Sequence, residues 1–225
     1  MIIEYFNNDV STSYQDLKNE LSNPTIIKNI DSVCLSYHNA KYIKSIIQNN
    51  SHKKILIGTY IDYPLGIADH STRINQLIEI VKLGIDFINI SMQTSYLTNK
   101  KYDKIRAELT EYNNICKPQN IEIRYNLEYR QFDHTLLKKI CTLLKMNNIN
   151  KIYPSSGFFL DDINDNIIAC KFLSNETGIL SFCTGKAWTK QHIDNIIKSK
   201  LYGVSTNSIH TISEILSSHK NEAEQ

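Results

Sequence analysis

Three polar side chains of one strand-like segment have the types and the spacing that acid–base chemistry requires. Arg124, Asn126 and Glu128 alternate with apolar residues in and just after the run Ile121–Leu127. Because successive side chains of a strand point to opposite faces, these three share one face. A carboxylate there could transfer protons, while the guanidinium could orient a substrate or stabilise an oxyanion. The alternative interpretation is an ion pair of Arg124 with Glu128 that only fills the interior, and the residues leave both open.

Small residues follow three later strand-like runs, as in turns that bind phosphate through their backbone N–H groups. A glycine turn is also simply what a loop requires, so binding and plain loop geometry both remain open. Lys186 adds a cation beside one of these turns, although a lone loop lysine is usually solvated. The candidate phosphate-binding residues are Ser155, Ser156, Gly157, Gly185, Lys186, Ser205 and Thr206.

Strand-like runs alternate with amphipathic helical patterns along the chain, and this order must position those side chains. The predicted strands are Ser32–Leu35, Ile55–Ile61, Phe87–Ser91, Ile121–Leu127, Lys151–Tyr153, Ile179–Phe182 and Tyr202–Val204. Hydrophobic spacing predicts helices over Ser13–Leu21, Ser71–Leu83, Tyr102–Cys116, Asp133–Met146, Ile163–Leu173, Lys190–Ser199 and Thr211–Ser217.

The alternation predicts an α/β protein with parallel strands and outer helices. Seven or eight such units in about 220 residues fit a closed (β/α)8 TIM barrel, in which function gathers at the C-terminal ends of the strands. An open doubly wound sheet is the rival, but no Gly-x-Gly-x-x-Gly motif follows the first predicted strand. No linker-like tract divides the chain, so we expect one domain over residues 1–217 and a polar tail over 218–225.

Composition excludes several classes of protein. The 225 residues are 41% hydrophobic, enough for a substantial core, and the net charge of +2 is not that of a nucleic-acid binder. The five cysteines form no Cys-x-x-Cys pair, which indicates reduced thiols in a cytoplasmic protein. We expect no membrane partner, since no run of about 18 apolar residues occurs. No cluster has metal-ligand spacing, and we expect neither metal nor cofactor.

The order and spacing of several short motifs resemble the deoxyribose-phosphate aldolase family, from about Ile3 to Ile209. Cys34 matches the family's first-strand cysteine, and Glu128 falls on the acidic residue that ends one of its later strands. The other matching segments are Tyr63-Pro64-Leu65-Gly66, Gly84-Ile85-Asp86-Phe87-Ile88-Asn89, Tyr102-Asp103, Tyr153-Pro154-Ser155-Ser156-Gly157-Phe158, Phe182-Cys183-Thr184-Gly185-Lys186 and Gly203-Val204-Ser205-Thr206. The resemblance implies a class I aldolase barrel that binds a sugar phosphate.

The chain departs from this family where the family's chemistry lies. Tyr153 stands in place of the Schiff-base lysine, Phe182 in place of a second lysine, and Asn89 in place of the acid–base aspartate. The early Asp-His-Thr run appears as Glu4-Tyr5-Phe6. A carbinolamine needs a primary amine, which neither a phenol nor a benzyl group has. We therefore expect no ordinary deoxyribose-phosphate cleavage.

Three hypotheses follow for the function. The first is a repurposed lyase, isomerase or cyclase for a small phosphorylated or anionic metabolite, with Glu128 and Tyr153 as acid and base and Arg124 and Asn89 orienting the substrate. The second is a non-catalytic barrel that binds a metabolite or serves as a regulatory subunit, and a homodimer is compatible with both. The third is an aldolase that still forms a Schiff base, but on a lysine at another position. In the first two, the pocket would also be lined by Cys34, Asn126 and Phe182.

The third hypothesis needs a lysine within reach of the substrate, and Lys151 and Lys186 are its two candidates. Lys151 shares the parity of Tyr153, so it would point inward one layer lower. Lys186 replaces a glycine of the family and could either strengthen anion binding or block the pocket. Trp188, close by, could line the mouth of the pocket or contact a second subunit.

Overall fold

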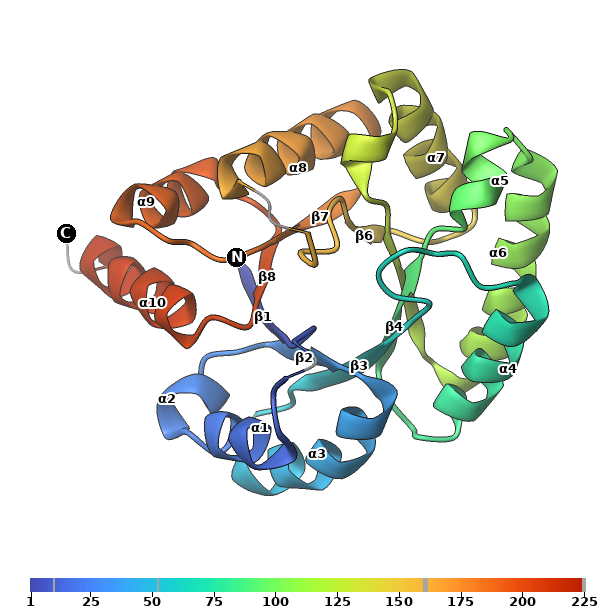
Figure 1. Cartoon of the computed structure of the whole chain (residues 1–225). Helices are drawn as coiled ribbons and strands as arrows, with labels where there is room; N and C mark the ends of the chain where they lie inside the picture. The colour runs from blue at the N-terminus through green and yellow to red at the C-terminus, as the bar shows by residue number, and fades with distance from the viewer. Residues whose placement is uncertain (10, 52, 160–161, 224–225) are drawn as a thin grey trace.

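The computed structural model describes residues 1–9, 11–51, 53–159 and 162–223, which form a closed barrel of eight parallel strands (Figure 1). Each strand pairs with the next one in sequence, and β1 pairs with β8 to close the barrel. The predicted (β/α)8 TIM barrel is therefore confirmed. The strands are β1 (Ile2–Phe6), β2 (Ser32–Leu35), β3 (Leu56–Ile61), β4 (Phe87–Ser91), β5 (Glu122–Asn126), β6 (Lys151–Tyr153), β7 (Leu180–Thr184) and β8 (Gly203–Thr206).

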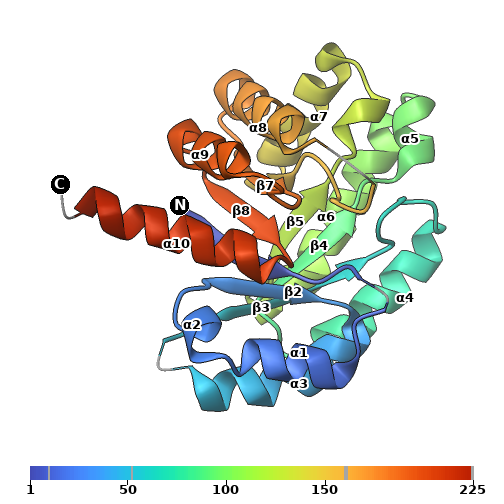
Figure 2. The same cartoon turned by 60° about the vertical axis from the view of Figure 1, so that its left-hand side comes forward.

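Helices cover the outside of the barrel (Figure 2), and several begin at a side-chain cap such as Ser13, Asp69 or Asp133. Within the described ranges, no helix has both the length and the apolar character needed to cross a membrane. The helices are α1 (Tyr14–Leu21), α2 (Pro24–Ile27), α3 (Tyr37–Asn50), α4 (His70–Val81), α5 (Thr94–Thr98), α6 (Tyr102–Cys116), α7 (His134–Met146), α8 (Ile163–Thr177), α9 (Lys190–Ser199) and α10 (Ile209–Ala223), with 3-10 turns η1 (Lys117–Gln119) and η2 (Tyr129–Gln131).

The sequence patterns did not predict β1 and α3, nor the short elements α2, α5, η1 and η2. Ser32–Leu35, which we numbered as the first strand, is β2, because Ile2–Phe6 forms a strand before it. This correction moves Glu4 from an unassigned N-terminal segment into the wall of the barrel, between β2 and β8. Glu4 interrupts the apolar run Ile2–Phe6, and a charge inside such a run does not fit the continuous apolar pattern expected of a buried parallel strand.

The last helix is longer than predicted. α10 begins at Ile209 and continues to Ala223, past Ser217, where we expected it to end. Its first turn is held by a hydrogen bond from the Thr211 N–H to the Ser208 hydroxyl, at 3.2 Å. Residues 224 and 225 of the expected tail lie outside the described residues.

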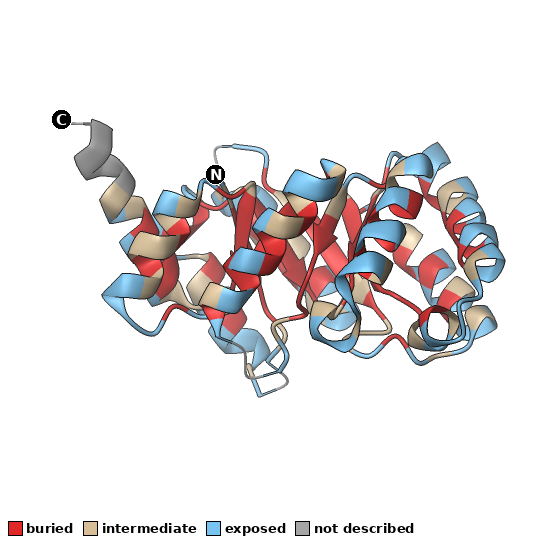
Figure 3. Cartoon of the chain, turned by 90° about the horizontal axis from the view of Figure 1, so that it is seen from above, coloured by how far each residue is buried: buried red, intermediate tan, exposed pale blue. Residues whose placement is uncertain are grey.

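Buried side chains fall into two groups on the two faces of the sheet. The larger group packs between the strands and the inner faces of the helices, where Figure 3 shows the buried positions in red. The smaller group lies on the inner side of the barrel wall and contains Phe6, Cys34 and Phe87. Partly buried Tyr60 and Tyr63 pack against this smaller group. Alternation along the strands thus gives an aliphatic outer layer and an aromatic interior.

Two glycines make room for aromatic rings inside the barrel. A Cβ atom at Gly58 would collide with ring carbons of Phe87, and a Cβ at Gly203 would lie 2.7 Å from two ring carbons of Phe182. Each glycine therefore provides the space that a bulkier interior ring occupies. The consequence is that rings fill the middle of the barrel, where side chains of a TIM barrel normally pack in layers.

Candidate functional site: a filled barrel below an open mouth

Glu4, on β1, is a fully buried carboxylate at the centre of a hydrogen-bond network. One of its oxygens, Oε2, accepts from Arg124 at 2.8 Å, from the Ser32 hydroxyl at 2.8 Å and from the Tyr153 hydroxyl at 3.1 Å. The other, Oε1, accepts from the Ser205 hydroxyl at 2.9 Å. A buried carboxylate with this many donors is well compensated for the water it has lost.

Arg124 lies at the same level of the barrel and is equally well paired. Its Nε donates to Glu122 at 2.5 Å, and its Nη1 donates to Glu4 and, at 3.0 Å, to the Tyr153 hydroxyl. Burial lowers the pKa of Arg124, but Tyr153, Glu4 and Glu122 outweigh burial and raise it overall. Of the two sequence interpretations, the geometry favours a satisfied ionic cluster, and the carboxylates that pair with Arg124 are Glu4 and Glu122, on β1 and β5.

Aromatic rings enclose the guanidinium of Arg124. Its central carbon lies 3.5 Å from the ring centroid of Phe87 and 5.0 Å from that of Phe182. The Phe182 ring also stacks on Tyr153, with centroids 5.0 Å apart and planes inclined by 17°. Phe182 thus serves as packing for Arg124 and Tyr153 in the interior of the barrel.

Tyr153, the last residue of β6, is buried with 1% of its surface exposed. Burial raises the pKa of its phenol well above the usual value, although the charge of Arg124 acts in the opposite direction. At neutral pH the hydroxyl therefore remains protonated and held between Arg124 and Glu4. A phenol in this state is a poor general base.

Three further predicted residues are buried in the barrel wall. Asn89 pairs in register with Arg124, and Asn126 pairs with Tyr153. The side-chain oxygen of Asn89 (Oδ1) has no hydrogen-bond partner among the described residues. The same is true of the side-chain nitrogen and oxygen of Asn126 (Nδ2 and Oδ1). Cys34 belongs to the aromatic interior, and burial raises the pKa of its thiol well above the usual value. This cysteine is a packing residue by its surroundings and not an activated nucleophile.

Glu128 turns toward the loop that follows β6. Its backbone is left-handed, with φ of 49°, and its Oε1 accepts from the Ser156 N–H at 2.5 Å. The same loop is braced by the Tyr63 hydroxyl, which donates to the Ser156 carbonyl at 2.7 Å. Glu128 therefore helps to hold the shape of this loop, and the acid–base role of its carboxylate stays a prediction.

Replacing Glu128 by alanine should loosen this loop. A hydrogen bond between a backbone N–H and a carboxylate contributes roughly 1.5–3 kcal/mol, so the loop should open more often than the barrel unfolds. Hydrogen exchange measured by NMR should show the Ser156 amide losing protection by about tenfold or more. Amides of β2 should keep their protection, and unchanged exchange at Ser156 would contradict the role assigned to Glu128.

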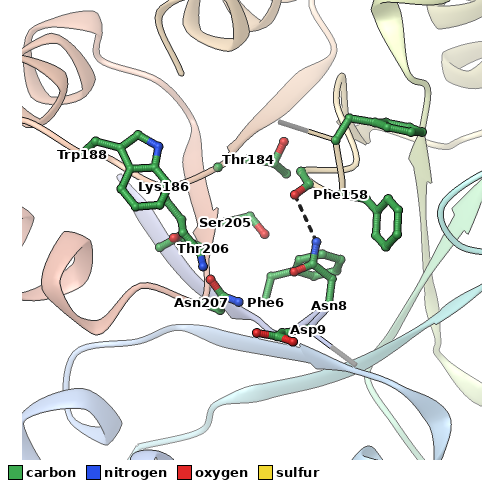
Figure 4. A pocket seen from close by; sticks show the side chains of 13 residues that line it. Phe6, Asn8, Asp9, Phe158, Thr184, Lys186, Trp188, Ser205, Thr206 and Asn207 are labelled. Atoms are coloured by element: carbon green, nitrogen blue, oxygen red, sulfur yellow. Dashed lines mark hydrogen bonds between the residues drawn. The ribbon is translucent and has the colours of Figure 1, made fainter. Parts of the chain in front are cut away.

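A pocket of about 410 Å³ lies at the mouth of the barrel, at the C-terminal ends of β1, β6, β7 and β8 (Figure 4). Five of the seven predicted phosphate-binding residues line it. Residues that the sequence analysis did not assign to a pocket line it as well, among them Asn8, Asp9 and Asn207, each of which lies just after a strand. The full lining is Phe6, Asn8, Asp9, Gly157, Phe158, Phe159, Thr184, Gly185, Lys186, Trp188, Ser205, Thr206 and Asn207.

The other two predicted phosphate-binding residues, Ser155 and Ser156, build the loop beside the pocket. The Ser155 hydroxyl accepts from the Gly157 N–H, and the Ser156 hydroxyl accepts from the Phe158 N–H, both at 3.1 Å. Gly157 has φ of 70°, a conformation that favours glycine, and a Cβ there would lie 3.3 Å from Thr184. Pattern alone could not separate a serine that faces the ligand from one that caps its own turn.

Phe6 separates the pocket from the charged interior. It lines the pocket, and its ring centroid lies 6.2 Å from that of Tyr153 and 5.5 Å from that of Tyr63. Only Ser205 belongs to both regions among the described residues, since it lines the pocket and donates to Glu4. Tyr153, Asn89 and Arg124 therefore lie in the interior of the barrel, whereas Glu128 lies with the predicted anion-binding loop that follows β6.

The two candidate lysines lie in different environments. Lys151 points toward the N-terminal end of the barrel, where its Nζ donates to Glu122 at 2.7 Å. Lys186 is exposed, lines the pocket, and lies 6.0 Å from the ring centroid of Trp188. The pocket stays open beside Lys186, and Trp188 lines its mouth. Among the described residues, no group of three or more His, Cys, Asp or Glu side chains is arranged to hold a metal ion.

No family model matches the chain, but curated sequences do. A deoxyribose-phosphate aldolase of Clostridioides difficile is 24% identical over 147 residues, which are 65% of this chain and 64% of that protein. A deoxyribose-phosphate aldolase of Dictyoglomus turgidum is 31% identical over 80 residues, 36% of this chain and 35% of that protein. The chain thus matches between about a third and just under two thirds of the length of these relatives.

Solved structures agree over nearly the full length of the chain. An aldolase described as QR15 superimposes with a TM-score of 0.77 at 18% identity, covering 99% of this chain and 96% of that one. The deoxyribose phosphate aldolase of Aeropyrum pernix, described as a unique tetrameric structure, gives a TM-score of 0.78 at 12% identity, covering 97% and 89%. The chain is thus similar in sequence to deoxyribose-phosphate aldolases over part of its length, and it shares the barrel fold of solved aldolase structures.

Proposed function

We propose that this protein is an aldolase-like barrel that has lost the Schiff-base lysine and binds a small phosphorylated metabolite at its mouth without forming an imine. The observation that carries this proposal is the separation of the pocket from Tyr153. The resemblance puts the imine-forming position at Tyr153, whose hydroxyl is held by Glu4 and Arg124 underneath Phe6. A carbonyl compound in the pocket meets no amine at that position.

The anion-binding half of the site supports ligand binding. Gly157, Gly185, Ser205 and Thr206 line the pocket at the ends of three neighbouring strands, and Lys186 brings a positive charge to its edge. Backbone turns and hydroxyl groups at the late strands of a barrel are suited to bind phosphate oxygens. The nearby Lys186 would add attraction that falls as the ionic strength rises.

A repurposed enzyme is the second candidate, and the geometry favours it less. That hypothesis requires Glu128 and Tyr153 to reach the ligand as acid and base. The carboxylate of Glu128 accepts from the Ser156 N–H, and the phenol of Tyr153 is buried with a raised pKa. Neither residue lines the pocket at the mouth of the barrel.

Calorimetric titration with deoxyribose 5-phosphate and with inorganic phosphate tests the proposal. We expect both compounds to bind, with no acetaldehyde released from the sugar phosphate over hours. Borohydride added with the sugar phosphate should leave the protein mass unchanged. Release of acetaldehyde, or a reduced adduct on Lys186 or Lys151, would show that an imine forms and would overturn the proposal. Absence of binding by both compounds would overturn it as well.

Lys186→Ala should weaken the binding of inorganic phosphate about fivefold at low ionic strength, because an exposed charge contributes up to about 1 kcal/mol. The difference between the variant and the unchanged protein should shrink as sodium chloride is added. Lys104→Ala, which removes an exposed lysine on the outside of α6, is the matched control and should leave binding unchanged. Equal losses in both variants would mean that net charge, and not the pocket, attracts the phosphate.

A further inference from the structure

Three large aromatic side chains at the pocket are exposed to solvent. Phe158, Phe159 and Trp188 have exposed fractions of 52%, 42% and 67%, and all three line the pocket. We call them the aromatic rim. They come from the loops that follow β6 and β7, next to the turns assigned to the phosphate. Exposed aromatic residues that gather at one concave site mark a surface that binds an apolar group.

The rim is positioned to contact a planar group. Phe158 packs edge-on against Tyr63, with centroids 6.2 Å apart and planes at 83°, and edge-on against Phe159, at 5.6 Å and 87°. These contacts support the Phe158 ring while it remains half exposed. Figure 4 shows Trp188 and Phe158 on opposite sides of the pocket, with Ser205 and Thr206 between them. A ligand with its phosphate at these hydroxyls can therefore reach either side of the rim.

Polar side chains beside the rim suit a sugar and the edge of a base. Asn8, Asp9 and Asn207 line one side of the pocket (Figure 4). The hydroxyl and the N–H of Ser11 donate to Asp9 and hold the pKa of its carboxyl below the usual value, so Asp9 is anionic at neutral pH. An anionic carboxylate repels phosphate but accepts hydrogen bonds from hydroxyl or amino groups. The pocket thus offers hydroxyl groups and Lys186 to an anion and the Asp9 carboxylate to hydrogen-bond donors, and Lys186 is near enough to Asp9 to help lower the pKa of its carboxyl.

We propose that the phosphorylated ligand of this pocket is a nucleotide, whose base stacks on the aromatic rim and whose phosphate lies at the turns after β7 and β8. This inference rests on the proposed function, since it needs the phosphate end of the site. A simple sugar phosphate has no planar ring for Trp188 or Phe158 to contact. The pocket volume of about 410 Å³ lies within the range of roughly 300–1,000 Å³ typical of small-molecule sites, which admits a mononucleotide.

Trp188 is the only tryptophan of the chain, so its fluorescence reports on the rim directly. We expect adenosine 5′-monophosphate to quench this fluorescence and to bind at least about fivefold more tightly than ribose 5-phosphate in calorimetry, because a base stacked on an aromatic ring adds affinity. Adenosine, which lacks the phosphate, should bind more weakly than the monophosphate. The three compounds thus measure the contributions of base and phosphate separately.

Two variants test whether the preference for adenosine 5′-monophosphate comes from the aromatic rim. Trp188→Ala and Phe158→Ala should each reduce the preference for the monophosphate over ribose 5-phosphate, while inorganic phosphate binds both variants as it binds the unchanged protein. Trp188→Phe should restore part of the preference. Met146→Ala, which removes another exposed apolar side chain at a site away from the pocket, should change none of these affinities.

The outcomes distinguish this inference from the proposed function. Equal affinity for adenosine 5′-monophosphate and ribose 5-phosphate would overturn the nucleotide inference and leave phosphate binding in place. A preference that persists in both Trp188→Ala and Phe158→Ala would also overturn it. If neither phosphate compound nor inorganic phosphate binds, the proposed function fails and the inference fails with it.

Discussion

Replacing Glu4 by alanine should lower the free energy of unfolding by about 3–5 kcal/mol, the cost of removing one partner of a buried ion pair. Glu4 is fully buried and accepts hydrogen bonds from Arg124, Tyr153, Ser32 and Ser205. Without this carboxylate, the buried guanidinium of Arg124 keeps Glu122 as its charged partner, and Glu122 is partly exposed. Urea unfolding followed by far-UV circular dichroism measures the change.

Two comparisons separate the loss of the pair from the loss of any charge. Glu4→Gln keeps the volume of the side chain, and combining it with Arg124→Met should cost less than the sum of the two single changes, because the double variant leaves no unpaired charge. Glu176→Ala breaks the exposed pair with Lys138, at 2.6 Å, and should cost less than about 1 kcal/mol. A loss of less than 1 kcal/mol for Glu4→Ala would contradict the central place of this carboxylate.

The fold could be predicted from the sequence because most strands and helices carry complete patterns. The strand Phe87–Ser91 and the helix Tyr102–Cys116 have the bounds that hydrophobic spacing predicted. Period-two alternation also brought Arg124 and Asn126 to one face of their strand correctly. The pattern broke down at Glu128, where the left-handed backbone ends the alternation. A local change of backbone conformation of this kind leaves no mark in hydrophobic periodicity.

The partner of Arg124 could not be predicted for a different reason. Glu4 is 120 residues away in sequence, and the two meet because β1 closes the barrel against β2 and β8. A carboxylate within an apolar run at the N-terminus, in Ile2-Ile3-Glu4-Tyr5-Phe6, was the available signal. A charge in such a run is buried only with a partner. The resemblance already aligned Glu4 with a functional segment, but pairing requires the closed barrel.

Some residues of the candidate site could be predicted from the sequence, and others could not. Turn residues such as Gly157 and Gly185 could be predicted because their conformations, with φ of 70° and 130°, favour glycine. The rim residues Phe159 and Trp188 could not, because an aromatic residue in a loop is compatible with packing, with an interface and with a ligand. Only the position of both loops around one pocket distinguishes these possibilities.

Gly58→Ala should destabilise the protein by about 1–3 kcal/mol, since an added methyl group in a filled interior forces its neighbours out of place. The new Cβ would collide with three carbons of the Phe87 ring. That ring cannot easily move, because the guanidinium of Arg124 packs over it, with its central carbon 3.5 Å from the ring centroid. Thermal and urea unfolding should both report the loss.

A second substitution distinguishes a steric effect from a change in backbone entropy. Alanine restricts the unfolded chain more than glycine does, so without the collision Gly58→Ala would be neutral or stabilising. Phe87→Leu shortens the ring side chain, and in its presence Gly58→Ala should cost clearly less than it does alone. If the two substitutions are simply additive, Phe87 does not fill the space beside Gly58. The interior of the barrel would then contain unfilled space, and a ligand could pass Phe6 and reach Tyr153. This result would contradict the separation of the pocket from Tyr153 on which the proposed function depends.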